Sequence, residues 1–212
     1  MNLPQDIEKY LSEHMTPESD LLQQIDRETN LEVLMPRMLS GHLQGALLSA
    51  FSNMLQPSCI LEIGTFTGYS AICMAKGLTK DGKLITIDKN EELEERVKKY
   101  FAASGFGDQI DYCVGNALTL VPTLTETFDL VFIDADKANY TTYYQQVIKN
   151  VRQGGFIIAD NVLWSGKIVQ YQKANDKDTV ALREFNQLVT NDKRVENFIL
   201  PIRDGLMIVR KL

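Results

Sequence analysis

The sequence predicts an α/β protein with a seven-stranded, mostly parallel sheet, helices on both faces and a reversed C-terminal hairpin. Short apolar segments rich in β-branched residues alternate with stretches of helical length. Such alternation is typical of a parallel sheet that is covered on both faces. The expected strands are 59–63, 83–87, 110–114, 128–133 and 155–160, and the helices between them are 69–78, 91–104 and 139–152.

The C-terminal tail departs from this alternation. Two further apolar segments, 195–201 and 205–212, are separated only by Ile202, Arg203 and Asp204. Such a connection is too short for a crossover helix, so the tail is expected to form an antiparallel hairpin at the sheet edge.

The N-terminal part, to about residue 55, is expected to be helical. Apolar residues recur there at helical spacing, for example Leu43, Leu47, Leu48 and Phe51. The length of 212 residues fits one domain, 1–212, that begins with this helical segment at about 1–55.

Composition limits the possible partners. The net charge of −6 disfavours a nucleic-acid partner, which needs a concentrated basic face. No run of 18 apolar residues is present, so no membrane span is expected. The N-terminus lacks a signal-peptide pattern, and Cys59, Cys73 and Cys113 all lie in apolar runs. These features are typical of reduced core cysteines in a cytoplasmic protein.

The loop after the first expected strand has the pattern of a nucleoside site. Glu62, Gly64 and Gly68 stand at a strand-to-helix junction, without the spacing of a dinucleotide fingerprint and without the lysine of a P-loop. Asp88 ends the second strand, 20 residues after Gly68, where an acid can bind both ribose hydroxyls. The combination favours S-adenosylmethionine. The alternative for Asp88 is a cap of the following helix.

Carboxylates also follow the fourth and fifth strands. Asp134 ends one strand, and Asp160 and Asn161 end the other. Adjacent parallel strands lie about 4.8 Å apart, so these side chains are expected to converge. Two carboxylates and an amide oxygen suit Mg²⁺. Zinc is disfavoured, because His14 and His42 are the only histidines. The alternative is that these residues are merely polar strand ends.

Four motifs carry a family resemblance: LEIGTFTGYSAICMA, LITIDKN, FIDADKANY and DNVLWSGKI. In this order and spacing they resemble the cation-dependent class I S-adenosylmethionine O-methyltransferases, the group that includes catechol and caffeoyl-CoA O-methyltransferases. The resemblance extends from about Leu34 to Leu212. It implies a Rossmann-like seven-stranded sheet with a reversed last hairpin.

The resemblance also implies the site. Asp134, Asp160 and Asn161 would hold Mg²⁺, or another divalent cation such as Mn²⁺ or Ca²⁺, and Lys137 would be the general base. Asp136 would either position Lys137 or cap the next helix. The residues implied to bind S-adenosylmethionine are Met38, Ser40, Glu62, Gly64, Ser70, Asp88, Asn116, Ala117 and Asp134.

The expected function is transfer of a methyl group to a hydroxyl of a vicinal-dihydroxy, catechol-like small aromatic. By analogy with the family we expect a homodimer, built partly from Leu31, Val33, Leu34 and Met35. Two alternatives remain open at this point. The chain could be a metal-independent methyltransferase acting on another nucleophile, or a non-catalytic protein that binds S-adenosylmethionine.

Less is predicted about the acceptor. Segment 163–180 is expected to form a loop over it, in which Trp164 either walls the aromatic ring or anchors the core. Tyr140 and Tyr144 share a helix face, so at least one should pack inside. Lys9 and Arg27 are the only basic residues in 1–35, which favours a free catechol or flavonoid over a coenzyme A thioester.

Overall fold

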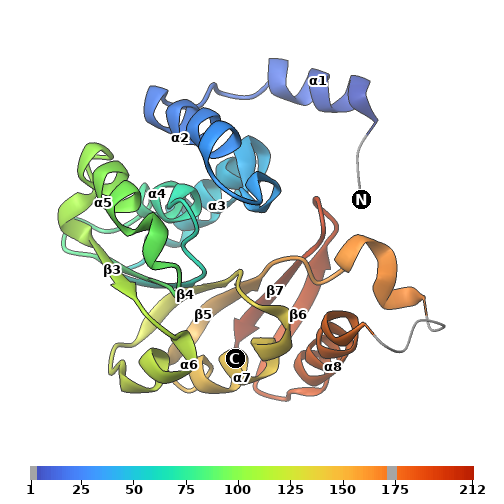
Figure 1. The fold of residues 1–212 in the computed structure, drawn as a ribbon. Coiled ribbons are helices and arrows are strands. Elements are labelled where there is room, and N and C mark those ends of the chain that lie inside the picture. Colours follow the sequence, from blue (N-terminus) through green and yellow to red (C-terminus); the bar gives the residue numbers. More distant parts are fainter. Residues whose placement is uncertain (1–3, 171–175) are drawn as a thin grey trace. The chain divides into compact units, whose positions relative to one another are not determined.

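The computed structural model describes residues 4–170 and 176–212 (Figure 1). These residues form two compact units, and each is described by itself. The first unit comprises residues 59–64 and 116–212, and the second comprises residues 4–58 and 65–115.

The sheet of the first unit has the strand order β1-β4-β5-β7-β6. The strands β1, β4 and β5 are parallel, whereas β7 is antiparallel to both β5 and β6. The predicted C-terminal hairpin is therefore confirmed. The strands are β1 (Cys59–Ile63), β4 (Phe128–Ile133), β5 (Val151–Ala159), β6 (Val195–Leu200) and β7 (Leu206–Lys211).

Helices of the first unit pack through aromatic side chains. Tyr140 and Tyr144 of α7 are fully buried, as predicted for at least one of them. Both rings meet Phe185 of α8 edge-on, at centroid distances of 5.5 and 6.1 Å. The helical segments are α6 (Ala117–Leu120), η4 (Val121–Thr123), η5 (Lys137–Asn139), α7 (Tyr140–Val147), η6 (Trp164–Val169) and α8 (Lys177–Asn191).

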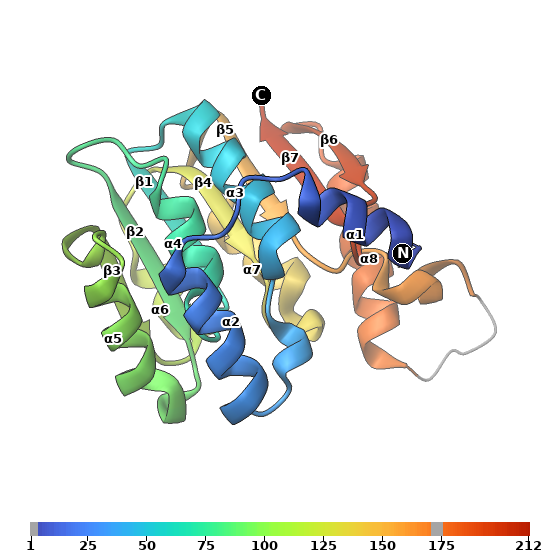
Figure 2. The same ribbon diagram turned by 90° about the horizontal axis from the view of Figure 1, so that it is seen from above.

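The second unit contains two parallel strands, β2 (Lys83–Asp88) and β3 (Ile110–Val114). Its helix α4 is buried along its whole length, whereas α1 stands apart from α2–α5 in both ribbon views (Figures 1 and 2). The helical segments are α1 (Gln5–Glu13), α2 (Asp20–Glu32), η1 (Pro36–Met38), α3 (Gly41–Leu55), α4 (Tyr69–Ala75), η2 (Glu91–Leu93), α5 (Glu94–Ala103) and η3 (Gly107–Gln109).

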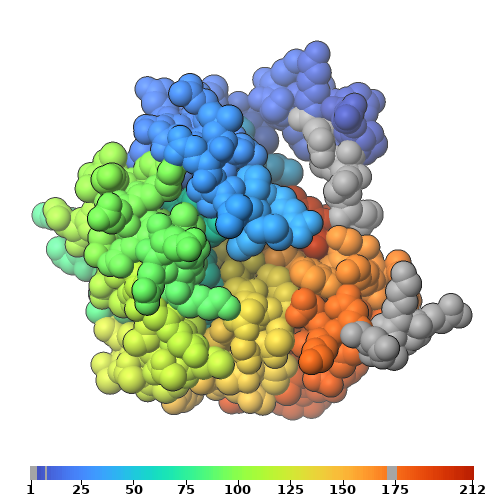
Figure 3. Space-filling model, in the orientation of Figure 1, coloured from blue at the N-terminus to red at the C-terminus, as the bar shows by residue number. Residues whose placement is uncertain are grey.

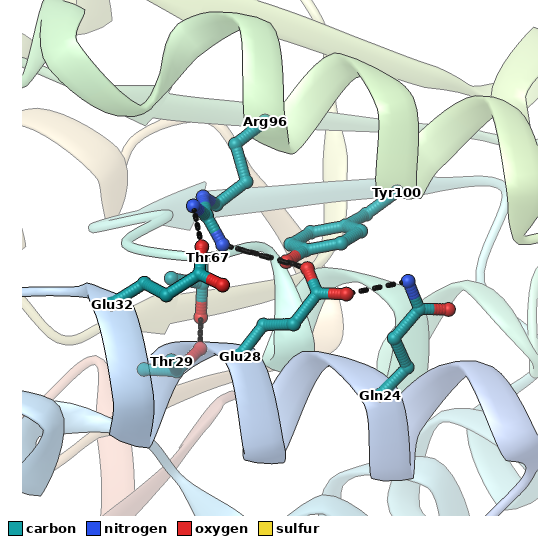
Figure 4. Close-up of polar contacts among 7 residues, drawn as sticks. All are labelled: Gln24, Glu28, Thr29, Glu32, Thr67, Arg96 and Tyr100. Atoms are coloured by element: carbon teal, nitrogen blue, oxygen red, sulfur yellow. Dashed lines mark hydrogen bonds and ion pairs between the residues drawn. The ribbon is translucent and has the colours of Figure 1, made fainter.

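A polar network joins α2 to α5 within the second unit (Figure 4). The guanidinium of Arg96 on α5 contacts the carboxylates of Glu28, at 3.5 Å, and Glu32, at 2.6 Å, on α2. The hydroxyl of Tyr100 donates to Glu28 at 2.5 Å, and Gln24 donates to the other oxygen of that carboxylate at 2.7 Å. The space-filling view shows α2 (blue) beside α5 (green) (Figure 3). This network, which we call the α2–α5 clamp, fixes α2 by charge-assisted hydrogen bonds.

The predicted fold class is confirmed, because the strands belong to a seven-stranded α/β sheet with a reversed hairpin. Several element boundaries were wrong. The helix predicted at 139–152 ends at Val147, and the strand predicted at 155–160 begins already at Val151. The strand crosses Gly154, which has a φ of +72°, and the pairing register with β4 shifts between Phe128 and Leu130. An interruption of this kind hides the start of a strand from periodicity.

The predicted loop at 163–180 was also partly wrong, because η6 and the start of α8 fall inside it. Residues 171–175 of that segment lie outside the described residues. In the part of the chain that the structure describes, no helix is long and apolar enough to cross a membrane.

Candidate active site

Two carboxylates stand at the ends of adjacent strands, as the sequence predicted. In the register of β4 and β5, Ile133 pairs with Ala159, so Asp134 and Asp160 are the next residues on the two strands. The Asp160 amide donates to the Ile133 carbonyl at 2.9 Å, and the Asp134 amide donates to the Ile63 carbonyl at 2.8 Å. The strand ladder therefore continues through both aspartates and fixes their backbones at one edge of the sheet.

The oxygen donors at this edge fit a hard divalent cation. Asp160 is 3% exposed, and its Oδ1 accepts the amide of Asn161 at 2.6 Å. Asn161 has a φ of +61°, a left-handed conformation that asparagine tolerates better than most residues. Among the described residues, no three of His, Cys, Asp and Glu are grouped as a metal site. The predicted metal ligands are not a group of that kind, because one of the three is the amide of Asn161. Two carboxylate oxygens and one amide oxygen suit Mg²⁺.

Lys137 is connected to both strand ends by hydrogen bonds, directly to Asp134 and through Tyr140 to Asp160. Its side chain is only 9% exposed, and a buried ammonium must be paired. The Nζ donates to Asp134 Oδ1 at 3.0 Å and to the hydroxyl of Tyr140 at 2.6 Å. That hydroxyl in turn donates to the carbonyl of Asp160 at 3.0 Å. A single chain of hydrogen bonds thus links the predicted base to both predicted metal-binding strand ends.

The hydrogen bonds of Tyr140 were not predicted from the sequence, which indicated only that at least one of Tyr140 and Tyr144 packs inside. Burial raises the pKa of Tyr140 well above its ordinary value, and the charges of Asp134 and Asp160 raise it further. The phenol therefore stays protonated and can donate a hydrogen bond. The available signal was the spacing of three residues between Lys137 and Tyr140, which places two side chains on one side of a helical turn.

Asp136 was predicted to position Lys137 or to cap the next helix. Its carboxylate accepts a hydrogen bond from Tyr143 at 2.7 Å and another from Asn139. It makes no side-chain capping hydrogen bond to η5, so the capping alternative is wrong. Asn139 ends η5, whereas Tyr143 lies in the first turn of α7, so Asp136 ties the start of η5 to α7.

Asp88 organises the glycine loop in the second unit. Its Oδ2 accepts the amides of Thr65, at 3.0 Å, and Phe66, at 2.7 Å, while Oδ1 accepts the amide of Asn90 at 2.9 Å. The helix-cap alternative was wrong, because the side chain of Asn90 itself accepts the Glu92 amide. A carboxylate offers about four acceptor positions, so three amides leave capacity for a ribose hydroxyl.

Packing by itself already requires the two glycines of this loop. Gly64 has a φ of +104°, and a Cβ there would lie 1.9 Å from the carbonyl oxygen of Asp134. A Cβ on Gly68 would lie 2.7 Å from the ring of Phe101. Between the glycines, Thr67 accepts a hydrogen bond at 3.2 Å from Thr29 of α2 (Figure 4). The loop is therefore shaped by its own surroundings.

The predicted cofactor residues fall in both units. Met38 is 54% exposed, whereas Ser40 and Ser70 are buried. Asn116 is the N-cap of α6, and its side chain accepts the Leu118 amide. The second unit holds Met38, Ser40, Ser70 and Asp88, and the first unit holds Glu62, Gly64, Asn116, Ala117 and Asp134. Their joint role in binding S-adenosylmethionine stays a prediction.

Trp164 lies in a strained segment that follows Asn161. It has a φ of +46°, and its indole Nε1 is buried without a partner among the described protein atoms. The Nζ of Lys167 lies 5.6 Å from its ring centroid. The turn of the β6–β7 hairpin holds this segment. The Asp204 side chain accepts the Ser165 amide, and the Asp204 carbonyl accepts the Leu163 amide at 2.9 Å.

Comparison with known proteins assigns this architecture to a family. The family described as O-methyltransferase matches residues 12–212. The chain belongs to this family, the S-adenosylmethionine-dependent O-methyltransferases.

Individual relatives agree with this assignment. The chain is 34% identical to caffeoyl-CoA O-methyltransferase 1 of Eucalyptus globulus, over 80% of the chain and 73% of that protein. It is 32% identical to a catechol O-methyltransferase of Niastella koreensis, over 92% and 89%. The crystal structure of the O-methyltransferase TomG of Streptomyces achromogenes, in complex with S-adenosylmethionine, has a TM-score of 0.90 at 28% identity and covers 97% of this chain and 96% of TomG.

Proposed function

We propose that this O-methyltransferase transfers a methyl group from S-adenosylmethionine to one hydroxyl of a catechol-like small aromatic and that it needs a divalent metal. The observation that carries the proposal is the hydrogen bonding of Lys137. Its Nζ lies 3.0 Å from Asp134 and is linked through the Tyr140 hydroxyl to the carbonyl of Asp160. The oxygens that would hold the cation and the group that would accept the proton therefore belong to one hydrogen-bonded cluster. The similarity to a catechol and a caffeoyl-CoA O-methyltransferase supports this substrate class.

Asp134, Asp160 and Asn161 would hold the metal, with Mg²⁺ as the first choice and Mn²⁺ or Ca²⁺ as substitutes. A bound divalent cation lowers the pKa of an acceptor hydroxyl and orients the acceptor. In its neutral amine form, Lys137 Nζ would take the proton of the reacting hydroxyl as a general base and become the ammonium. Asp88, with its remaining acceptor capacity, would bind the ribose.

The reaction balances without a further reactant. The acceptor oxygen forms a bond to the methyl carbon while the carbon–sulfur bond breaks. The electron pair of that bond stays on sulfur, so the sulfonium becomes the neutral thioether S-adenosylhomocysteine. The acceptor proton passes to Lys137 Nζ and then to solvent. Holding the two reactants in line supplies much of the acceleration.

The test is a methylation assay on an acceptor panel of a free catechol, a flavonoid and a caffeoyl thioester, read by mass spectrometry for a gain of one methyl group. We expect activity that EDTA abolishes and that added Mg²⁺ restores. Because residues 1–35 carry few cations, the free catechol or flavonoid should react best. Full activity in EDTA would favour the metal-independent alternative. Calorimetric binding of S-adenosylmethionine without turnover of any acceptor would contradict the proposed substrate class.

We also propose a homodimer that uses the end of α2 and the segment after it. Leu31, Leu34, Met35 and Met38 there are 74%, 83%, 49% and 54% exposed, and water contact with so much apolar surface is unfavourable. Light scattering should give twice the chain mass of 24.0 kDa. Leu34→Glu should reduce that mass, whereas Val169→Glu, which alters an exposed apolar residue of the first unit, should not. A wild-type mass of 24.0 kDa at micromolar concentration would exclude the dimer.

We propose that the enzyme acts in the cytoplasm, because Cys59, Cys73 and Cys113 all lie in apolar runs, as is typical of reduced core cysteines. Fractionation of cells that produce the protein would test this placement.

A further inference from the structure

We propose that Tyr140 is a positioning residue, which holds the side-chain nitrogen of Lys137 at the point where it meets the acceptor hydroxyl. This inference rests on the proposed function, because it assigns Tyr140 a task only if Lys137 takes part in proton transfer. It concerns orientation alone, and the phenol itself does not touch the substrate in this scheme.

The contact between Lys137 and Tyr140 is a directed hydrogen bond. The Nζ of Lys137 lies 2.6 Å from the phenol oxygen but 4.7 Å from the centroid of the ring. The nitrogen is therefore bound by a lone pair of the oxygen, rather than by the face of the ring. A hydrogen bond fixes both distance and direction, whereas attraction to a ring face fixes neither closely.

Tyr140 is itself fixed on several sides. It is 0% exposed, and its ring meets Phe185 of α8 edge-on. Its hydroxyl proton points to the carbonyl of Asp160 at 3.0 Å, with that of Ile133 more distant at 3.3 Å. The Ile133 carbonyl already accepts the Asp160 amide, so the Asp160 carbonyl is the better acceptor. Since the proton is committed there, an oxygen lone pair remains directed at Lys137.

Asp134 alone would hold Lys137 less well. A lysine side chain has four rotatable bonds, and one ionic contact leaves it considerable freedom. The Asp134 side chain is also 21% exposed, and its oxygens are needed for the metal in the proposed function. Tyr140 is neutral, fully buried and outside the proposed metal shell. Its hold on Lys137 therefore persists whatever the carboxylate of Asp134 binds.

Two other tyrosines of α7 provide matched controls. The hydroxyl of Tyr143 donates to Asp136 at 2.7 Å, and that of Tyr144 donates to Asp192 at 2.9 Å. Both are buried tyrosines on the same helix with one carboxylate partner each. Replacing either by phenylalanine removes a similar hydrogen bond without touching Lys137.

The experiment compares Tyr140→Phe with Tyr143→Phe and Tyr144→Phe in the Mg²⁺-loaded enzyme. We expect Tyr140→Phe to lower kcat roughly tenfold, because a small misplacement of a reacting group slows reactions to this degree or more. The KM values for both substrates and the affinity for Mg²⁺ should stay within about twofold, since no binding group is lost. The two control variants should keep kcat within about twofold. Wild-type kcat in Tyr140→Phe, or equal losses in all three variants, would overturn the inference.

A double-mutant cycle separates positioning from a general structural effect. In a Lys137→Ala background, Tyr140→Phe should have no further effect on kcat, because the side chain that it positions is absent. A further tenfold loss in that background would overturn the inference. If Lys137→Ala itself has wild-type kcat, the general-base role in the proposed function fails first. If Lys137→Ala is impaired but Tyr140→Phe is not, the positioning role alone fails.

A measurement on the wild-type protein covers the case in which Tyr140→Phe does not fold. In protein labelled with ¹⁵N-lysine, the ammonium signal of Lys137 is assigned by its loss in Lys137→Ala. Its hydrogens should exchange with water much more slowly than those of the exposed Lys89. Exchange at the Lys89 rate would overturn the inference.

Discussion

Gly64 and Asp134 approach each other so closely that no side chain can begin at position 64. A Cβ there would lie 1.9 Å from the Asp134 carbonyl oxygen, well inside van der Waals contact. The glycine at the end of β1 thus sets the path of the chain just where the first predicted metal ligand stands.

Gly64→Ala should therefore destabilise the protein by about 3 kcal/mol or more, since the backbone must shift to relieve the overlap. Gly105→Ala is the matched control, because Gly105 also has a positive φ, +80°, but no atom within 4 Å of its Cβ position. Left-handed strain alone should cost that variant about 1 kcal/mol. Urea unfolding measures the free energy of unfolding of both variants. Equal losses of stability would show that the close approach of Asp134 to Gly64 is unimportant.

Asp88→Ala should weaken binding of S-adenosylmethionine roughly 10- to 150-fold, from the loss of charge-assisted hydrogen bonds of about 1.5–3 kcal/mol. It should also lower stability, because the amides of Thr65, Phe66 and Asn90 lose their acceptor. Calorimetry and thermal unfolding separate the two effects. Asp111→Ala, at an exposed acid on β3, is the control and should change neither. Affinity within twofold of wild type in Asp88→Ala would remove Asp88 from the cofactor site.

Asp134→Ala and Lys137→Ala should both lose methyltransferase activity, but for different reasons. The first variant loses a metal ligand, so its apparent affinity for Mg²⁺ should fall and excess Mg²⁺ should restore part of the rate. The second keeps the metal-binding oxygens, so its Mg²⁺ dependence should be unchanged while kcat falls 10²- to 10⁴-fold, as is typical of a lost general base. Higher pH should restore part of that rate, because hydroxide can then deprotonate the acceptor.

The measurement is kcat against Mg²⁺ concentration and pH for both variants. Asp81→Ala, an exposed acid of the second unit, serves as a control and should match the wild type. Unchanged Mg²⁺ dependence in Asp134→Ala would show that Asp134 is not a metal ligand. Wild-type turnover of Lys137→Ala at neutral pH would show that Lys137 is not the general base.

The α2–α5 clamp should make stability depend on pH. The hydrogen bond from Tyr100 lowers the pKa of Glu28 below its ordinary value of 4.5, and the Gln24 side chain and Arg96 lower it further. A carboxylate with a lowered folded pKa stabilises the fold above the unfolded pKa, and this stabilisation is lost as pH falls through the folded value. Glu28→Gln should therefore unfold at lower urea concentration than the wild type at pH 7, and the difference should shrink below pH 4.5.

Glu95→Gln, at an exposed position of α5, is the control for that comparison and should follow the wild type at every pH. A difference between wild type and Glu28→Gln that is independent of pH would show that the charge of Glu28 is not what fixes α2.

The sequence predicted the strand ends well because their chemistry is local. Asp134 and Asp160 follow apolar β-branched runs, and parallel pairing then brings equivalent ends together. The hydrogen bond between Lys137 and Tyr140 was not predicted. A tyrosine on the inner face of a helix is buried whether or not its hydroxyl binds a functional side chain, so the sequence pattern is the same. Only the three-dimensional structure shows where its hydroxyl points.

The hydrogen bonds by which Asp88 holds the glycine loop were likewise not predicted from the sequence. Its spacing after Gly68 indicated a ligand-binding acid, but the amides of Thr65 and Phe66 that it accepts belong to a distant loop whose backbone direction depends on tertiary structure. The start of β5 was missed for a similar reason, since Gly154 lowers local strand propensity while pairing with β4 compensates.

The strand order β5-β7-β6 also determines when the fold can be completed during synthesis on the ribosome. β7 comes after β6 in the chain, yet it lies between β5 and β6 and pairs with both. While the chain is being made, β6 therefore leaves the exit tunnel before the strand that will attach it to the sheet. The turn at Asp204, which holds the segment after Asn161, can be locked in place only when β7 has emerged. Nascent chains arrested before residue 206 should accordingly expose the edge of β5 to chaperones, whereas chains that have extruded β7 should not.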